Sequence, residues 1–143
     1  MGAEQVARDL VSNMTDVEKT KAKLTPDAIA SGGILPQPLP AMEAFGLVGA
    51  LKAGFPDIKY EPLQVTVNGD KARVKFQMTG TQTGPLSLPI PGLPATIPPS
   101  GKKVKVEDVF VVTVQGDKIS HLEVDSPADG GIPAILTQLG VKM

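Results

Sequence analysis

Asp108 is the residue of this sequence whose position most favours chemistry. It lies in the alternating run 102–125, KKVKVEDVFVVTVQGDKISHLEVD, which predicts two β-strands joined at Gly116-Asp117. Because side chains alternate between the faces of a strand, Asp108 shares an otherwise apolar phase with Val106 and Phe110. A carboxyl group placed there loses hydration, which raises its pKa toward the range of a general acid or base. The structural alternatives are a solvated place at the rim of the sheet and capping by backbone N–H groups.

His121 and Glu123 form a second candidate pair, on the polar phase of the strand after the turn. Leu122 and Val124 occupy the apolar phase, so in this register the pair faces solvent or a partner subunit. Slipping the strand by one residue would turn His121 and Glu123 inward as an acid–base pair. The slip would also bury several ionisable groups and expose Leu122 and Val124, which is costly. The pair is therefore a catalytic candidate only in the slipped register.

The inward phases of the predicted strands indicate an apolar pocket around Asp108. The return strand that begins at Ala72 contributes to it, and Tyr60, at the start of an earlier strand, is interpreted as a packing residue. The residues expected to line the pocket are Phe76, Met78, Phe110, Val112, Leu122 and Val124.

The composition bounds the possible functions. The 143 residues are a usual size for a single domain, expected to span 1–143. A formal net charge of −1 argues against nucleic acid and anionic membranes as partners. The absence of cysteine and the single histidine argue against a metal site, and no cofactor motif is present. Residues 1–10 lack a secretory signal and no apolar run could span a membrane, so we expect a cytoplasmic protein.

The N-terminal half reads mainly as helix. Apolar residues recur at three- and four-residue spacing over residues 4–23, and Thr25-Pro26-Asp27 fits the start of a short second helix. Residues 34–40 contain three prolines and predict an extended loop. Residues 41–53 again predict a helix, with Met42, Phe45, Val48 (or Leu47) and Leu51 as its buried stripe.

The C-terminal half reads mainly as strand. Residues 60–68 and the run from Ala72 form a hairpin around Asn68-Gly69-Asp70, and the run 102–125 forms a second. Residues 127–139 predict a short closing helix. Helices followed by an antiparallel meander are typical of an α+β fold, in which one sheet face covers the helices and the other meets solvent or a partner.

A proline-rich segment, residues 85–99, separates the two hairpins. Its apolar side chains would form an exposed patch if they all faced water. We therefore expect burial at the pocket mouth or against another subunit for Leu86, Leu88, Ile90 and Leu93.

Two turns and several flanking segments resemble the SnoaL-like polyketide cyclase branch of the nuclear transport factor 2-like superfamily. The turns are Gly80-Thr81-Gln82-Thr83-Gly84 and Ile97-Pro98-Pro99-Ser100-Gly101-Lys102. Further likeness lies in Gly116-Asp117-Lys118-Ile119, in Phe55-Pro56-Asp57 and in the tail Leu136-Thr137-Gln138-Leu139-Gly140. The resemblance spans roughly residues 40–140.

The resemblance implies a cone, in which a bent antiparallel sheet of about four to six strands wraps around N-terminal helices. It also implies a deep pocket and, in many members, a homodimer through the outer sheet face. Family cyclases carry an acid–base pair on the last strand, at positions that match Leu122 and Val124 here, and neither residue moves protons.

Two functional hypotheses therefore stand side by side. The first is a cofactor-free enzyme, polyketide cyclase-like or ketosteroid isomerase-like, that moves a proton on a small hydrophobic carbonyl compound with Asp108 as acid or base. The second is a non-catalytic module that binds a small apolar ligand or dimerises, which the poverty of inward-facing ionisable groups favours.

Overall fold

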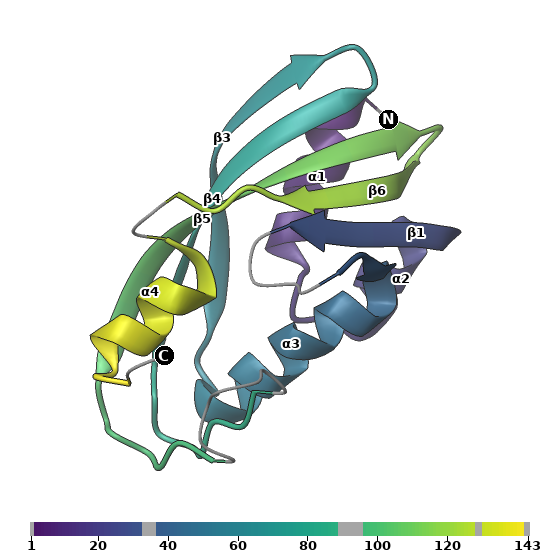
Figure 1. The fold of residues 1–143 in the computed structure, drawn as a ribbon. Coiled ribbons are helices and arrows are strands. Elements are labelled where there is room, and N and C mark those ends of the chain that lie inside the picture. Colours follow the sequence, from purple (N-terminus) through teal and green to yellow (C-terminus); the bar gives the residue numbers. More distant parts are fainter. Residues whose placement is uncertain (1, 33–36, 89–95, 128–129, 142–143) are drawn as a thin grey trace.

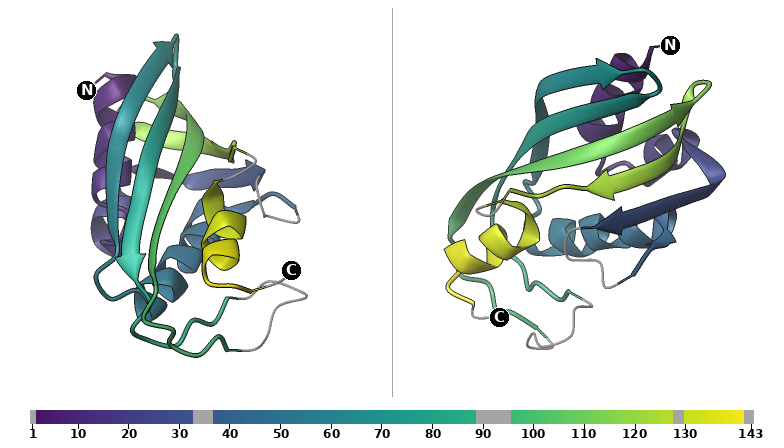
Figure 2. Two further views of the ribbon diagram at one scale, coloured as in Figure 1. Left: turned by 90° about the vertical axis from the view of Figure 1, so that its left-hand side faces the viewer. Right: turned by 45° about the horizontal axis from the view of Figure 1, so that its top comes forward.

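The computed structural model describes residues 2–32, 37–88, 96–127 and 130–141. Figure 1 shows a strongly bent sheet with helices packed along it. Along the chain, helices and strands are interspersed. Two further views show α3 lying against β1 and α4 lying beside one end of β5 (Figure 2).

Two short helices, α1 (Ala3–Ser12) and α2 (Val17–Ala22), replace the single helix predicted for residues 4–23. The break falls where polar side chains compete for backbone groups. Asn13 donates its side-chain amide to the carbonyl of Asp9 at 2.9 Å, and Asp16 accepts the backbone N–H of Lys19 at 3.1 Å as the N-cap of α2. Such local bonds favour caps and turns over continued helix.

Strand β1 (Leu24–Gly32) stands where a second short helix was predicted to begin, so that prediction is wrong. β1 pairs in parallel with β6 (Lys118–Val124) and antiparallel with the two-residue strand β2 (Leu39–Pro40). Pro26, which cannot donate to a ladder, lies where the β1–β6 register is interrupted between Leu24 and Ile29.

Helix α3 (Ala41–Gly54) confirms the helix predicted for residues 41–53. Leu51 is buried and Phe45 and Val48 are half-buried, as the predicted stripe requires. Met42 is 37% exposed, so its predicted burial is wrong. It lies on the side of α3 that faces a groove toward α2 rather than the sheet.

The remaining strands confirm the two predicted hairpins. They are β3 (Lys59–Asn68), β4 (Lys71–Thr81) and β5 (Lys103–Gln115), with β6 completing the second hairpin. The strand order β2-β1-β6-β5-β4-β3 gives a six-stranded sheet. Its pairs are antiparallel except β1–β6, so the sheet is mixed where a purely antiparallel one was predicted.

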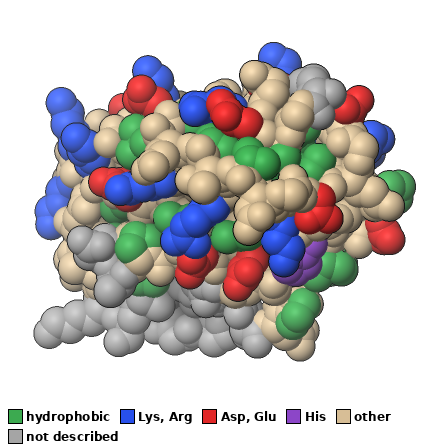
Figure 3. All heavy atoms as spheres, turned by 90° about the horizontal axis from the view of Figure 1, so that it is seen from above, with side chains coloured by type: hydrophobic (Ala, Val, Ile, Leu, Met, Phe, Trp, Pro, Cys, Tyr) green, Lys and Arg blue, Asp and Glu red, His purple; other side chains and the backbone are tan. Residues whose placement is uncertain are grey.

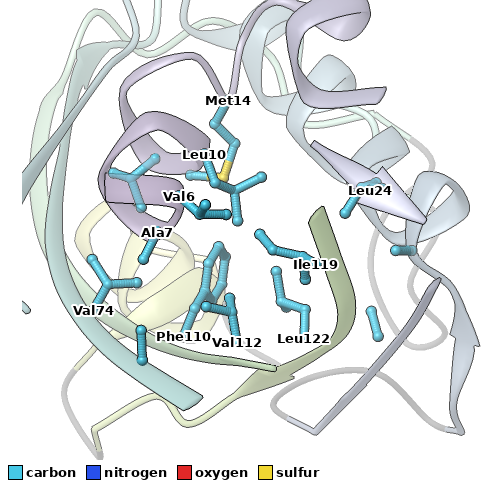
Figure 4. Packing of buried hydrophobic residues seen from close by; sticks show 14 of the residues in the cluster. Val6, Ala7, Leu10, Met14, Leu24, Val74, Phe110, Val112, Ile119 and Leu122 are labelled. Carbon is cyan, nitrogen blue, oxygen red and sulfur yellow. The ribbon is translucent and has the colours of Figure 1, made fainter. Parts of the chain in front are cut away.

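The larger core lies between α1 and the inner face of the sheet. Figure 4 shows Val6, Leu10 and Met14 directed toward Phe110, Val112 and Leu122. The spacing of the apolar residues of α1 places them on one side of the helix, which is the side it buries. α1 therefore fills one end of the bent sheet.

A second core fills the other end of the sheet. It includes Phe55, which is fully buried, together with the lower parts of β4 and β5 and the closing helix α4 (Gly131–Gln138). Leu86 and Leu88 are buried, as predicted, but they pack into this core of their own chain and not at a pocket mouth or against another subunit. Ile90 and Leu93 lie outside the described residues.

The edge of β5 that extends past the end of β6 is covered by α4. The amide of Gln138 accepts the backbone N–H of Lys105 at 3.0 Å and donates to the Lys105 carbonyl at 3.0 Å. One side chain thus imitates a neighbouring strand and satisfies edge groups that would otherwise be open to pairing. This contact also anchors α4 beside the inner face, where it closes one wall of a cavity.

Candidate functional site

An apolar cavity lies between α3, the inner face of the sheet and the start of α4. The space open to the centres of water-sized molecules is about 100 Å³, and the cavity opens to solvent at its mouth. Among its lining side chains only Tyr60, Asp108 and Ser126 carry an oxygen. The other lining residues are Met14, Ala44, Phe45, Leu47, Val48, Leu51, Phe76, Met78, Val106, Phe110, Leu122, Val124, Gly131, Ile132, Pro133 and Ile135.

Asp108 projects into this cavity from β5. It lies opposite Phe76 of β4 and is half-buried between Val106 and Phe110. One oxygen, Oδ1, accepts the hydroxyl of Ser126 at 2.6 Å and the backbone N–H of Val109 at 2.8 Å. The other, Oδ2, accepts no hydrogen bond from the described residues. The carboxylate is therefore held through one oxygen and leaves the second for a ligand.

Burial is the main influence on the charge of Asp108. Loss of hydration raises the pKa of the Asp108 carboxyl, and the negative charge of Asp125 adds to this rise. The bonds from Ser126 and Val109 act in the opposite direction, because they stabilise the ionised form. The pKa of Asp108 lies above its ordinary value, which makes the carboxylate a stronger base than a solvated one.

A tight turn brings Ser126 to Asp108. The chain leaves β6, and Asp125 donates its backbone N–H to the Val109 carbonyl at 2.8 Å, so the segment stays alongside β5. Gly131 then has a φ of +68°, and a Cβ there would lie 2.6 Å from the Ser126 hydroxyl and 3.3 Å from Asp108 Oδ2. Only glycine permits this backbone so close to the carboxylate.

Tyr60 of β3 is the second functional group of the cavity. Its ring packs on that of Phe76, with centroids 5.9 Å apart and planes inclined by 60°. Burial and the negative charge of Asp108 both raise the pKa of the Tyr60 hydroxyl, so the phenol stays protonated at neutral pH. The hydroxyl has no hydrogen-bond partner among the described residues.

Five of the six residues predicted to line the pocket do so, namely Phe76, Met78, Phe110, Leu122 and Val124. The prediction for Val112 is wrong. Its side chain is fully buried in the core beneath α1 and does not reach the cavity. Alternation places it on the correct face of β5, but the cavity occupies only part of that face.

His121 and Glu123 lie away from the cavity. They pair with Thr113 and Val111 on the outward phase of β5, and His121 Nε2 is 3.1 Å from the hydroxyl of Ser31 on β1. Leu122 and Val124 take the inward positions, opposite Val112 and Phe110. The slipped register is therefore not adopted, and the structure does not bring His121 and Glu123 to Asp108.

The family model of the SnoaL-like polyketide cyclases matches residues 5–123. The chain belongs to this family. No curated protein matches the sequence. The fold is that of the nuclear transport factor 2-like and ketosteroid isomerase-like proteins.

Solved structures of other bacterial proteins resemble this SnoaL-like chain over nearly its whole length. A protein from Jannaschia sp. CCS1, proposed to be a SnoaL-like polyketide cyclase, is 23% identical, with a TM-score of 0.74, and the match covers 99% of this chain and 93% of that one. IdmH from Streptomyces antibioticus, a proposed polyketide cyclase, is 19% identical, with a TM-score of 0.74 and coverage of 99% and 100%. A proposed cyclase from Pseudomonas putida KT2440 is 13% identical, with a TM-score of 0.64 and coverage of 91% and 95%. At these identities the structural likeness establishes the fold alone. The chemistry must be inferred from the residues of the cavity.

The described residues contain no cluster of His, Cys, Asp and Glu arranged to hold a metal ion. Likewise, none of the described helices is both long and apolar enough to cross a membrane. Side chains of both charges intermix on the face seen in Figure 3.

Sequence reasoning found Asp108 but missed its partners. Ser126 follows the last strand in a turn, where alternation gives no information on side-chain direction. Tyr60 was interpreted as a packing residue, and the structure shows that it both packs and lines the cavity. The Gly130-Gly131 pair, which lets the start of α4 lie beside the carboxylate, was the one sequence feature that could have indicated this close contact.

Proposed function

We propose that this SnoaL-like protein is an enzyme that moves a proton on a small, hydrophobic carbonyl compound. The observation that carries the proposal is the arrangement of Asp108, with Oδ1 held by two hydrogen bonds and Oδ2 open to an apolar cavity. A carboxylate so held is a positioned base. The chemistry needs no cofactor, because the carboxylate itself accepts and returns the proton.

In the proposed reaction, Asp108 Oδ2 removes a proton from the carbon next to the carbonyl. The C–H bond breaks and its electron pair moves onto the carbonyl oxygen, which becomes an enolate. The Tyr60 hydroxyl donates a hydrogen bond to that oxygen, where charge develops in the transition state. If the substrate carries a β,γ double bond, the enolate takes the proton back from Asp108 at the γ-carbon, which is isomerisation. If it carries a second carbonyl, the enolate carbon attacks that carbonyl and closes a ring, and the alkoxide so formed takes the proton back from Asp108.

Deuterium exchange tests this proposal without knowledge of the natural substrate. Fused-ring ketones such as tetralones would be incubated with the protein in D₂O, and loss of the α-proton signal would be followed by NMR. Asp108→Asn should lower the catalysed rate by about 100-fold or more, as removal of a general base does. Glu107→Gln is the matched control, because it removes a charge from the adjacent residue, which forms an outward ion pair with Lys75. Equal rates in wild type and Asp108→Asn would refute the proposal.

The second candidate is a non-catalytic module that binds a small apolar ligand. The scarcity of polar groups in the cavity favours it, since Tyr60, Asp108 and Ser126 are the only side-chain oxygens among the lining residues. A binder would retain ketones in wild type and in Asp108→Asn alike and would exchange no α-protons in either. Binding and exchange measured on the same ketone therefore separate the two functions.

We also propose that two copies associate through the outer face of the sheet. Supporting this, the outer face of β3–β5 is hollowed and lined by side chains that include Gln64, Thr66 and Lys75. Paired charges such as Arg73 with Asp125 fix the side chains there. Light scattering at micromolar concentration tests this, and a monomer mass would overturn it.

A further inference from the structure

Asp108 is the only charged side chain among the described lining residues of the cavity. None of the described lining residues is a lysine, an arginine or a histidine. The nearby cations are already paired, Arg73 with Asp125 and Lys75 with Glu107, and these side chains are about half exposed. The hydrogen bonds of Ser126 and Val109 satisfy one oxygen of Asp108 but supply no positive charge. The carboxylate therefore has no counter-ion among the described residues of an apolar site, where an unpaired charge is costly.

Aromatic rings surround this carboxylate. Phe76 is its direct cross-strand neighbour, and Phe110 is the next residue on the same face of β5, so both side chains lie within reach of it. Their ring centroids are 4.6 Å apart and the planes are inclined by 59°, and Tyr60 also packs on Phe76. With Phe45 from α3, four of the five aromatic residues of the chain line this one cavity.

We infer that the cavity binds small hydrophobic organic ammonium ions, with Asp108 as counter-ion and with Phe76 and Phe110 supplying aromatic faces. The face of an aromatic ring attracts a cation, and alkylated ammonium groups carry their charge on an apolar surface that suits such a cavity. An anion would meet the carboxylate, and a strongly polar ligand would lose hydrogen bonds that the cavity does not replace.

One feature of the site opposes a cation. The start of α4 lies at Gly131 beside Asp108, and the N-terminus of a helix carries a partial positive charge of about half an elementary charge. The ionised carboxylate carries a full negative charge. Asp125 also acts on the Asp108 carboxyl, but its charge is offset by its partner Arg73. The sum leaves the cavity negative and retains the preference for a cation.

This inference does not rest on the proposed proton transfer. A cavity that only binds would show the same preference, and a cavity that catalyses would take amine-bearing molecules as substrates or as competitors. The experiment below therefore yields a result whether or not ketone exchange is observed.

Choline and its uncharged carbon isostere, in which a tert-butyl group replaces the trimethylammonium group, form the test pair. Calorimetry or ligand-observed NMR at neutral pH should show choline binding at least about tenfold more tightly, a difference of about 1.4 kcal/mol. Asp108→Asn should abolish the preference, so that choline and its isostere bind with similar affinity. Phe76→Leu, which keeps the apolar volume and removes the ring, should reduce the preference by a smaller factor.

Glu107→Gln again serves as the control and should retain the full preference, because its carboxylate is paired with Lys75 outside the cavity. Equal affinity of wild type for the two ligands would overturn the inference and show that shape and apolarity alone select ligands. Failure of both ligands to bind at millimolar concentration would overturn it as well. Choline binding without ketone exchange would support the inference and count against the proposed enzyme, whereas exchange without choline selectivity would do the reverse.

Discussion

The hydroxyl of Ser126 should stabilise the folded protein more strongly while Asp108 is ionised than when it is protonated. Its bond to Asp108 Oδ1 measures 2.6 Å, a length typical of a hydroxyl that donates to a charged oxygen. Such bonds contribute about 1.5–3 kcal/mol. Because both side chains are partly exposed, we expect Ser126→Ala to lower the free energy of unfolding by about 1.5 kcal/mol at pH 7, the lower end of that range.

The cost of Ser126→Ala should depend on pH in a defined direction. Burial raises the pKa of Asp108 above its ordinary value of 3.8, so the folded state binds more protons than the unfolded state between the two pKa values. The stabilisation linked to this group is therefore present below the unfolded pKa and is lost as pH rises through the folded pKa. Ser126→Ala removes an influence that lowers the pKa, so it should raise the pKa further and widen this window.

Urea unfolding at pH 7 and at about pH 3 measures both effects. At acid pH, Ser126→Ala should lower the free energy of unfolding by only about 0.5–1 kcal/mol, which is the contribution of a hydrogen bond between neutral groups. Ser120→Ala is the matched control, because its hydroxyl donates at 3.4 Å to the neutral carbonyl of Thr113. Its cost should be the same at both pH values. An equal cost of Ser126→Ala at both pH values, or a pKa of Asp108 that does not rise in a carboxyl NMR titration, would refute the reasoning.

Three further outcomes are expected. In urea unfolding, Gly131→Ala should lower the free energy of unfolding more than Gly116→Ala does. Both glycines have positive φ, +68° and +66°, so both variants share a backbone strain of about 1–2 kcal/mol. Only at Gly131 would a Cβ also meet other atoms. Val112→Ala should destabilise by about 2 kcal/mol and leave ligand affinity unchanged, whereas Val124→Ala should weaken ligand binding, since only Val124 lines the cavity. His121→Gln should leave ketone exchange unchanged in the NMR assay and cost no more than about 1.5 kcal/mol, the value of its single hydrogen bond.

Much of the sheet could be predicted because alternation and turn residues act locally. Asn68-Gly69-Asp70 and Gly116-Asp117 fixed both hairpins, and the apolar phase of β5 fixed which side chains face inward. The inward–outward alternation of side chains along β6 is interrupted once. A register shift between Thr113 and Val114 pairs Ile119 with Val114 and buries it, although alternation from Leu122 predicts Ser120 at that place. A bulge of this kind depends on the partner strand and leaves no mark in the sequence.

Apart from the predicted helix over residues 4–23, which local capping bonds divide, the predictions that went wrong depend on distant partners. β1 contains Pro26 and reads locally as a helix start, and it becomes a strand because β6 pairs with it from the other end of the chain. The same distinction between local patterns and distant contacts applies to the site. Asp108 stands out as an acid on an apolar phase, but its partnership with Ser126 and its nearness to Tyr60 arise from a turn and from a strand two places away in the sheet.

The parallel pairing of β1 with β6 has a consequence for synthesis. Ser31 and His121, which meet across this pair, are 90 residues apart. Apart from the two-residue β2, β1 has no neighbour in the sheet until β6 has been made. During translation β1 therefore lacks its main backbone partner until β6 is made, and contacts of such long sequence separation form slowly. β1 is therefore made before β3 to β6 but pairs with β6 late. A chaperone that shields residues 24–32 would act before β6 is made.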